Sequence, residues 1–244
     1  IISATPFTDD DAIDLESTDR LVDFYIEKGV SGITILGIMG EAHKLSGAES
    51  EAFLTHVISR VADRVPVVVG VSNAELDNLL RLTNVAMDAG AAGVMVAPMA
   101  GLNTEQKIYG YYARLFDSLA PGIPVCYQDF PQGTGVHVSV ECFNRLVGDF
   151  PQLVMLKHED WPGLDKLTQV RRASQSGEFR RVSILVGNGG LYLPQELARG
   201  ADGAMTGFAY PEMLVQVVKL HQSGDSERAE DLFDAYLPLV RYEQ

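Results

Sequence analysis

Lys157 is the residue of this chain whose position most suggests covalent chemistry. It follows the apolar run Leu153–Leu156, and turn-forming residues come soon after it at Pro162 and Gly163. A short apolar run bounded by such residues is typical of a strand buried on both faces. Burial disfavours the charged form of a lysine, and a neutral lysine amine attacks carbonyl carbons to form a Schiff base. We therefore predict Schiff-base chemistry at Lys157.

Tyr127 ends the preceding apolar run and is the second predicted catalytic residue. Side chains from adjacent strands can both face the axis of a barrel, so we expect the phenol beside Lys157, where it could carry protons to and from a substrate. Simpler interpretations stay open for both residues. Lys157 could extend to water or pair with Glu159 or Asp160, and Tyr127 could be a core residue with a satisfied hydroxyl.

Glycine-rich segments supply candidate substrate-binding groups. Their backbone can approach a ligand closely, and N–H groups in such turns can hold a carboxylate. The segment Gly187–Gly190 is also compatible with a phosphate site, but it is short and no basic residue follows closely. On these grounds the predicted substrate-binding residues are Gly37, Ile38, Met39, Gly40, Gly187 and Thr206.

The elements that must position these residues repeat along the chain. Eight short apolar runs are expected as strands: Ile1–Ala4, Ile33–Leu36, Val67–Val71, Val94–Ala97, Val125–Tyr127, Leu153–Leu156, Val182–Val186 and Ala204–Met205. Helical patterns separate most of them, at 18–28, 48–62, 76–89, 104–120, 140–147, 163–174 and 194–199. Strand followed by helix, repeated in this way, predicts a closed (β/α)8 TIM barrel of the α/β class. An open doubly wound sheet is the alternative.

We expect residues 1–210 to form the barrel as a catalytic domain. Residues 211–244 are expected to form a C-terminal helical extension, with helices over 212–221 and 226–240, and both ends of the chain are expected to be truncated. In a barrel of this kind the active site lies at the C-terminal ends of the strands. That rule brings Lys157 and Tyr127 to one end of the barrel. Because side chains alternate along a strand, His158 is expected to face the side opposite Lys157.

Composition excludes several classes of function. The chain has 244 residues, of which 46% are hydrophobic, and a formal net charge of -14. An acidic protein is a poor partner for nucleic acid or an anionic membrane. Cys126 and Cys142 form no disulfide framework, so we expect a cytoplasmic protein. The five histidines show no paired-ligand spacing, so no metal site is predicted.

Several motifs together resemble one family, and the resemblance covers nearly the whole chain. They are Thr5-Pro6-Phe7, Gly37–Glu41, Tyr127, Lys157 and Gly200–Met205. The chain resembles the dihydrodipicolinate synthase / N-acetylneuraminate lyase family of class I lyases and aldolases. The resemblance implies that Lys157 forms the Schiff base with pyruvate or another 2-keto acid and that Tyr127 shuttles the proton. It also implies that Met205 lines the pocket, that no cofactor is used, and that the protein is a homotetramer or homodimer.

The chain departs from the synthase pattern at three places. Ile38 and Met39 replace two adjacent hydroxyl residues, the segment Met99–Gly101 lacks a tyrosine, and the segment Gln132–Gly135 lacks an arginine. Other features resemble 2-keto-3-deoxy sugar acid dehydratases: Gln128-Asp129, Gly203–Gly207, Tyr210-Pro211 and Leu237–Glu243.

We therefore expect a Schiff-base lyase that acts on pyruvate or a 2-keto(-3-deoxy sugar) acid by aldol cleavage, condensation or dehydration. Three alternatives remain. The protein could be dihydrodipicolinate synthase proper, joining pyruvate to aspartate semialdehyde. It could be a barrel that has lost turnover and only binds keto acids, or a metal- or phosphate-dependent barrel enzyme.

Overall fold

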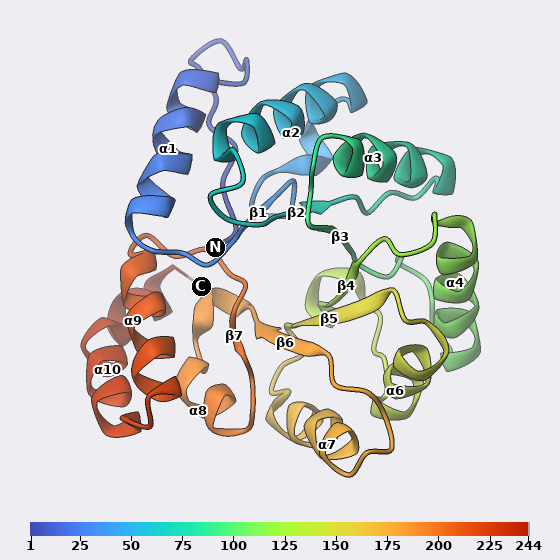
Figure 1. Cartoon of the computed structure of the whole chain (residues 1–244), viewed down its shortest axis with the longest axis vertical. Coiled ribbons are helices and arrows are strands. Elements are labelled where there is room, and N and C mark those ends of the chain that lie inside the picture. The colour runs from blue at the N-terminus through green and yellow to red at the C-terminus, as the bar shows by residue number, and fades with distance from the viewer. Residues whose placement is uncertain (244) are drawn as a thin grey trace.

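Seven parallel strands form one sheet, in chain order, in the computed structural model, which describes residues 1–243 (Figure 1). The strands are β1 (Ile33–Ile35), β2 (Val67–Gly70), β3 (Gly93–Val96), β4 (Val125–Asp129), β5 (Leu153–His158), β6 (Ser183–Val186) and β7 (Gly203–Ala204). β1 and β2 consist mostly of β-branched residues, as expected for strands covered on both faces, whereas β4 and β5 end in polar residues. The prediction of an α/β protein with a parallel sheet is confirmed.

Helices surround the strands in Figure 1 and lie on the outer side of the sheet. They are α1 (Leu15–Glu27), α2 (Gly47–Val61), α3 (Leu76–Asp88), α4 (Glu105–Ser118), α5 (Pro131–Thr134), α6 (Val140–Asp149), α7 (Leu164–Gln175), α8 (Leu193–Ala198), α9 (Pro211–Gln222) and α10 (Ser226–Tyr242). The nine predicted helices are all present, including both C-terminal ones. Only the short α5, which starts at Pro131 directly after β4, was not expected.

The first predicted strand, Ile1–Ala4, is not a strand of the sheet. It makes one parallel bridge, between Ile2 and Thr34 of β1. On its other side, the Ile2 N–H donates a hydrogen bond of 2.9 Å to the carbonyl of Thr206. Because β7 ends at Ala204, this contact lies beyond the ladder, and the segment therefore forms no continuous pairing. It does connect β1 with the segment that follows β7.

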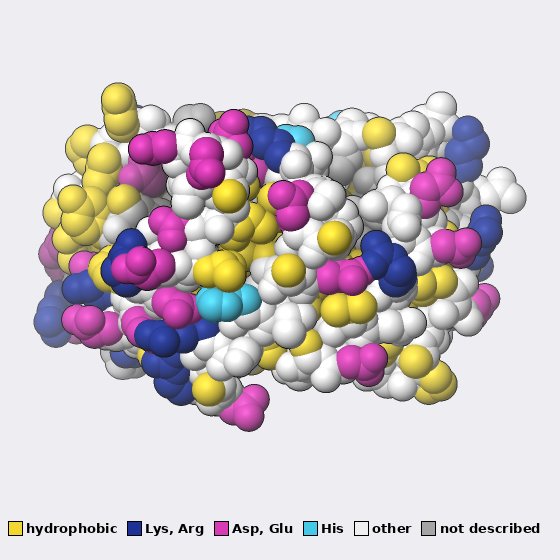
Figure 2. Space-filling view, turned by 90° about the horizontal axis from the view of Figure 1, so that it is seen from above, with side chains coloured by type: hydrophobic (Ala, Val, Ile, Leu, Met, Phe, Trp, Pro, Cys, Tyr) yellow, Lys and Arg dark blue, Asp and Glu magenta, His cyan; other side chains and the backbone are white. Residues whose placement is uncertain are grey.

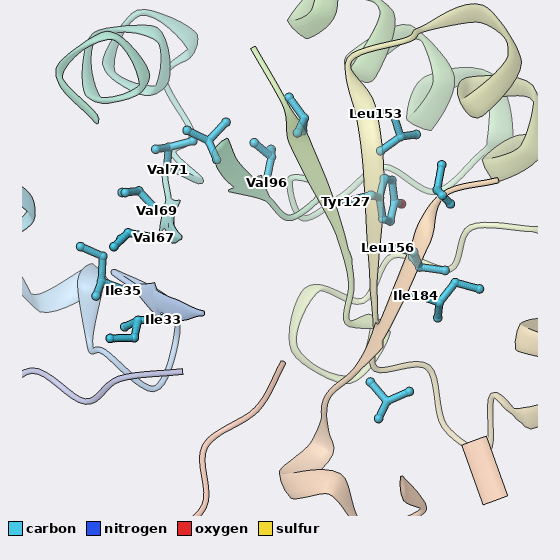
Figure 3. Packing of buried hydrophobic residues seen from close by; sticks show 14 of the residues in the cluster. Ile33, Ile35, Val67, Val69, Val71, Val96, Tyr127, Leu153, Leu156 and Ile184 are labelled. Carbon is cyan, nitrogen blue, oxygen red and sulfur yellow. The ribbon is translucent and has the colours of Figure 1, made fainter. Parts of the chain in front are cut away.

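Apolar side chains form two separate clusters on the two faces of the sheet. The larger one lies between the strands and the helices, and Figure 3 shows part of it around Val69, Leu156 and Ile184. The smaller one, on the face away from the helices, consists of Ile2, Met95, Cys126 and Met205. We call these the outer face and the inner face of the sheet.

One irregularity in β5 decides which side chains reach the inner face. The register between β4 and β5 shifts by one residue and leaves Val154 without a partner. A bulge of this kind moves the alternation of side chains by one position. Leu153 and Leu156, three positions apart, therefore both lie in the outer cluster. Lys157 turns to the inner face, where it pairs with Gln128 of β4.

The surface fits an acidic protein. Figure 2 shows acidic and basic side chains interspersed over one face, with apolar side chains gathered at its left end. Among residues 1–243, no helix combines the length and the apolar character needed to cross a bilayer.

Candidate active site

Lys157 lies on the inner face near the C-terminal end of β5, as predicted from the apolar run that precedes it. Its side chain is only 5% exposed, so the amine is withdrawn from bulk water. The Nζ atom is 2.9 Å from Oε2 of Glu159, two residues along the chain. The sequence left pairing with Glu159 open as the simpler interpretation of this lysine. The structure shows that pairing and also buries the pair inside the protein.

Glu159 connects Lys157 to the neighbouring strand. The Gln128 side-chain amide donates a 2.8 Å hydrogen bond to the same Oε2 atom that contacts Lys157. All three side chains are buried. A carboxylate held between an amine and an amide donor can accept a proton from the amine and return it. This arrangement of Lys157, Glu159 and Gln128, which we call the inner triad, has the composition of an acid–base site.

Tyr127 does not belong to this site, and the prediction that it faces the axis beside Lys157 is wrong. In the β4–β5 register Tyr127 pairs with Leu156, and Gln128 pairs with Lys157. The Tyr127 ring lies in the outer cluster, stacked on Tyr112 of α4 at 4.6 Å between ring centroids. Figure 3 shows it beside Leu156 among apolar side chains. Side chains alternate along a strand, so two residues that pair one position apart face opposite sides.

The surroundings of the Tyr127 hydroxyl also argue against proton transfer to a substrate. The hydroxyl has no hydrogen-bond partner among the described residues. Burial, with the nearby Asp129 carboxylate adding to it, raises the pKa of Tyr127 well above its ordinary value. An aromatic T-shaped contact with Phe143 of α6 fills the other side of the ring. Tyr127 is therefore a core residue between the sheet and the helices.

Gly187, predicted to bind substrate, lies against Glu159. A Cβ atom built at Gly187 would come within 2.6 Å of Cδ of Glu159 and still closer to Cγ and Oε1. No side chain fits there without moving the carboxylate. The Gly187 N–H donates to the carbonyl of His158 at 3.0 Å, which ties the end of β6 to the end of β5. The glycine at this position makes room for Glu159.

The loop after β1 borders the largest cavity near the inner triad. This cavity has a volume of about 790 Å³ and is lined by residues from the ends of β1 to β4, including Gly37, Ile38, Met95 and Gln128. Gln128 is thus in contact with both the cavity and Glu159. Ile38 and Met39 are 55% and 47% exposed, so their side chains are not part of the core. A ligand in the cavity would lie next to the backbone of this loop.

Gly40, Met205 and Thr206 lie farther from the cavity. The carbonyl of Gly40 accepts a 2.7 Å hydrogen bond from the hydroxyl of Thr5. Met205 belongs to the smaller apolar cluster with Ile2. Met205 and Thr206 both line a second cavity of about 330 Å³ that opens near the N-terminal ends of the strands. Both residues follow the C-terminal end of β7, but neither lines the larger cavity beside Gln128.

Cys126 is not suited to act as a nucleophile in this site. Burial raises the pKa of the Cys126 thiol to about 12, so it stays protonated at neutral pH and is a poor nucleophile. No three His, Cys, Asp or Glu side chains are grouped as metal ligands would be, within residues 1–243. His158 faces the outer side of β5, as the alternation predicted.

Two members of the inner triad were not predicted as site residues. Glu159 follows Lys157 by two positions, and this spacing alone puts both on the same face of an extended chain. Gln128 is the residue after Tyr127. Tyr127 was the predicted neighbour of Lys157, and a shift of one position in the register of β4 makes Gln128 the actual one. The signal for Glu159 was therefore in the sequence, whereas the register of β4 depended on the bulge at Val154.

Comparison with known proteins identifies the family of this chain. A family model described as the Dihydrodipicolinate synthetase family matches residues 1–242. The chain is 31% identical to a 4-hydroxy-tetrahydrodipicolinate synthase of Persephonella marina over 97% of its length and 79% of that protein. It is 30% identical to an L-2-keto-3-deoxyarabonate dehydratase of Azospirillum brasilense, covering 98% of this chain and 77% of that protein.

A solved structure is similar over almost the whole chain. The crystal structure of dihydrodipicolinate synthase from Rhodopseudomonas palustris superposes with a TM-score of 0.96 at 49% identity, covering 99% of this chain and 80% of that one. These relatives are lyases or synthases. The prediction that the protein is an enzyme of the class I aldolase type is therefore confirmed. The chain belongs to the dihydrodipicolinate synthetase family.

Proposed function

We propose that the protein is a Schiff-base-forming lyase that acts on a 2-keto-3-deoxy sugar acid and removes water from it. The observation that carries the proposal is the buried contact of 2.9 Å between Lys157 Nζ and Glu159 Oε2. It supports a lysine that can lose its proton to a neighbour and then attack a keto carbon. The resulting imine stays bound to the protein, so the proposed reaction needs no cofactor.

The proposed reaction proceeds through an imine on Lys157 and then an enamine. Glu159 takes the proton of the Lys157 ammonium, and the neutral amine adds to the C2 carbonyl of the keto acid. Glu159 returns the proton as water leaves, and the product is a protonated imine. Its positive charge acidifies the neighbouring C3–H bond, so Glu159 removes a C3 proton and an enamine forms. The enamine electrons then expel the C4 hydroxyl, which leaves as water with the proton that Glu159 holds. A water molecule then adds to C2 of the unsaturated imine, and hydrolysis releases the keto acid and restores the Lys157 amine.

The dehydratase assignment rests on what surrounds the inner triad. The large cavity holds far more than pyruvate, and polar side chains of Ser72, Asn73 and Asn78 line it away from Gln128. Such groups suit the hydroxyls of a sugar acid chain. Ile38 and Met39 offer no hydroxyl, which removes the relay expected of a synthase. The backbone of the same loop remains for the substrate carboxylate: the N–H groups of Ile38, Met39 and Gly40 donate no hydrogen bond among the described residues.

Dihydrodipicolinate synthase itself is the second candidate. Sequence identity with a 4-hydroxy-tetrahydrodipicolinate synthase of Persephonella marina and with a dihydrodipicolinate synthase of Rhodopseudomonas palustris favours it. Such an enzyme would condense pyruvate with aspartate semialdehyde through the same lysine. The two candidates share the imine and differ only in what reacts with the enamine.

The architecture that we propose is a closed (β/α)8 barrel. The segment Ile1–Ala4 takes the position of the eighth strand, between β1 and β7. The hydrogen bonds of Ile2 and Ser3 to Thr206 and Thr34 support it. We treat residues 1–210 as the catalytic domain and residues 211–243 as a helical extension; residue 244, which the expected extension also included, lies outside the described residues. A homotetramer or homodimer is our expectation from the family.

A substrate panel tests the function. Purified protein should release water from one or more 3-deoxy-2-keto acids and should leave pyruvate with aspartate semialdehyde unchanged. Glu159→Gln, which keeps the size and the hydrogen-bonding shape of the side chain, should lower turnover by about 100-fold or more, the usual contribution of an acid–base group. Turnover of pyruvate with aspartate semialdehyde alone would replace our proposal with the synthase.

A further inference from the structure

His158 occupies the position between Lys157 and Glu159 and is almost completely buried on the outer face of β5. Its Nε2 atom lies 2.9 Å from the carbonyl oxygen of Gly163, in the loop that leads from β5 to α7. Its Nδ1 atom is 3.8 Å from Oδ2 of Asp129, the last residue of β4. The chemistry proposed above uses none of these contacts.

The loop and the imidazole are closely interlocked. A Cβ atom at Gly163 would come within 2.6 Å of Cε1 of His158 and closer still to Nε2. Glycine at this position therefore lets the chain close over the ring. The backbone N–H of Glu159 also donates to the carbonyl of Asp129 at 2.9 Å. The stretch from 159 to 163 is thus fixed at its first residue by β4 and at its last by His158.

Charged side chains surround the ring from each neighbouring element. Asp129 of β4 forms an ion pair with Lys166 of α7 at 2.6 Å, and Lys166 also pairs with Asp160 of the loop at 3.1 Å. Glu196 of α8 lies close enough to interact with His158 electrostatically. The outer face behind the inner triad is therefore a second polar cluster, separated from the substrate side by the backbone of β5.

We propose that His158 is a positioning residue that holds Glu159 against Lys157. Residues 157 and 159 can face the inner side together only while residue 158 is kept outside, because side chains alternate along an extended chain. β5 ends at His158, and beyond it a single backbone hydrogen bond, from the Glu159 N–H to the carbonyl of Asp129, ties Glu159 to β4. The contact of His158 with Gly163 then sets the position of the carboxylate. Lys157 lies within the ladder, paired with Gln128 and Leu185, and depends less on it.

This inference rests on the proposed function, and two measurements separate them. Borohydride reduction in the presence of pyruvate traps the imine and reports on Lys157. Exchange of the C3 hydrogens of pyruvate for deuterium in D2O, followed by NMR, reports on the proton carrier. Wild-type protein that traps neither pyruvate nor any 3-deoxy-2-keto acid, and exchanges no C3 hydrogen, would overturn the proposed function and this inference with it.

The decisive comparison is between His158→Gln and His158→Leu. The glutamine amide can reach the position of Nε2 and donate to Gly163, whereas leucine fills similar space without a donor. We expect His158→Leu to trap pyruvate as the wild type does but to exchange about 100-fold more slowly, the scale of loss from a displaced catalytic group. His158→Gln should restore most of the exchange.

Two further variants keep the test independent of folding. Gly163→Ala places a methyl group against both the imidazole of His158 and the carbonyl of Asp160, and it should also slow exchange while trapping persists. Ile184→Val, a core change on the outer face of β6, should lower thermal stability without altering either rate. Equal exchange in His158→Leu and wild type, equal slowing in both His158 variants, or a parallel loss of trapping and exchange would each overturn the inference.

Discussion

The Glu159 carboxylate and the Lys157 amine face each other across 2.9 Å on the inner side of β5, with His158 turned away between them. This relationship replaces the predicted pair of Lys157 with Tyr127. A carboxylate so close to the amine can remove its proton, hold it, and return it to the leaving group. Both steps that need a proton carrier can therefore use one residue.

Tyr127→Phe should leave catalysis unchanged. The hydroxyl lies in the outer cluster without a hydrogen-bond partner, so its removal is expected to be neutral or slightly stabilising. Turnover and thermal unfolding of the variant check this. A fall in turnover of about 100-fold, as for the loss of an acid–base group, would return Tyr127 to the mechanism.

Gly187→Ala should impair proton transfer more than imine formation. The new Cβ would occupy the place of Cγ and Oε1 of Glu159 and push the carboxylate from Lys157. We expect deuterium exchange into pyruvate to slow by about 10- to 100-fold while borohydride trapping persists. Gly110→Ala is the matched control, because a Cβ at Gly110 in α4 meets no atom within 4 Å. Equal exchange rates in the two variants would contradict the role of Gly187.

Glu196 should make the stability of the protein depend on pH. Burial raises the pKa of this carboxyl from 4.5 to about 7, while His158 acts in the opposite direction. Between pH 4.5 and about 7, the folded state holds the proton of Glu196 more strongly than the unfolded state does. Its contribution to stability is therefore present below pH 4.5 and is lost as the pH rises to about 7, by roughly 3 kcal/mol.

Glu196→Gln should remove this dependence. Relative to wild type, the variant should gain stability in urea denaturation at pH 8 and show little difference at pH 4.5. Glu178→Gln alters an exposed carboxylate and serves as the control. A constant difference between wild type and Glu196→Gln across this range would show that Glu196 titrates normally.

The sequence was sufficient for the sheet and for Lys157 but not for the partner of Lys157. The apolar runs predicted all seven strands of the sheet, and the helical patterns between them predicted nine of the helices. The spacing of apolar residues along the chain reflects burial directly. The segment Ile1–Ala4 reads as a strand by composition, yet its pairing depends on the short β7 at its other side. Local patterns do not contain that information.

The error at Tyr127 has a specific physical origin. Which face a strand residue takes depends on register, and a shift of one position reverses every side chain. The bulge at Val154 supplies such a shift between β4 and β5. Val154 is an ordinary strand former, so nothing in the residue types marks the bulge. Glu159, by contrast, was predictable from its two-residue spacing to Lys157.

The central claim is that Lys157 forms an imine with a 2-keto acid, and borohydride trapping with pyruvate tests it most directly. We expect a stable adduct on the peptide that contains Lys157 in the wild type, and no adduct in Lys157→Ala, with both proteins folded by circular dichroism. No adduct in the wild type with pyruvate or any 3-deoxy-2-keto acid, or an adduct that persists in Lys157→Ala, would contradict the account.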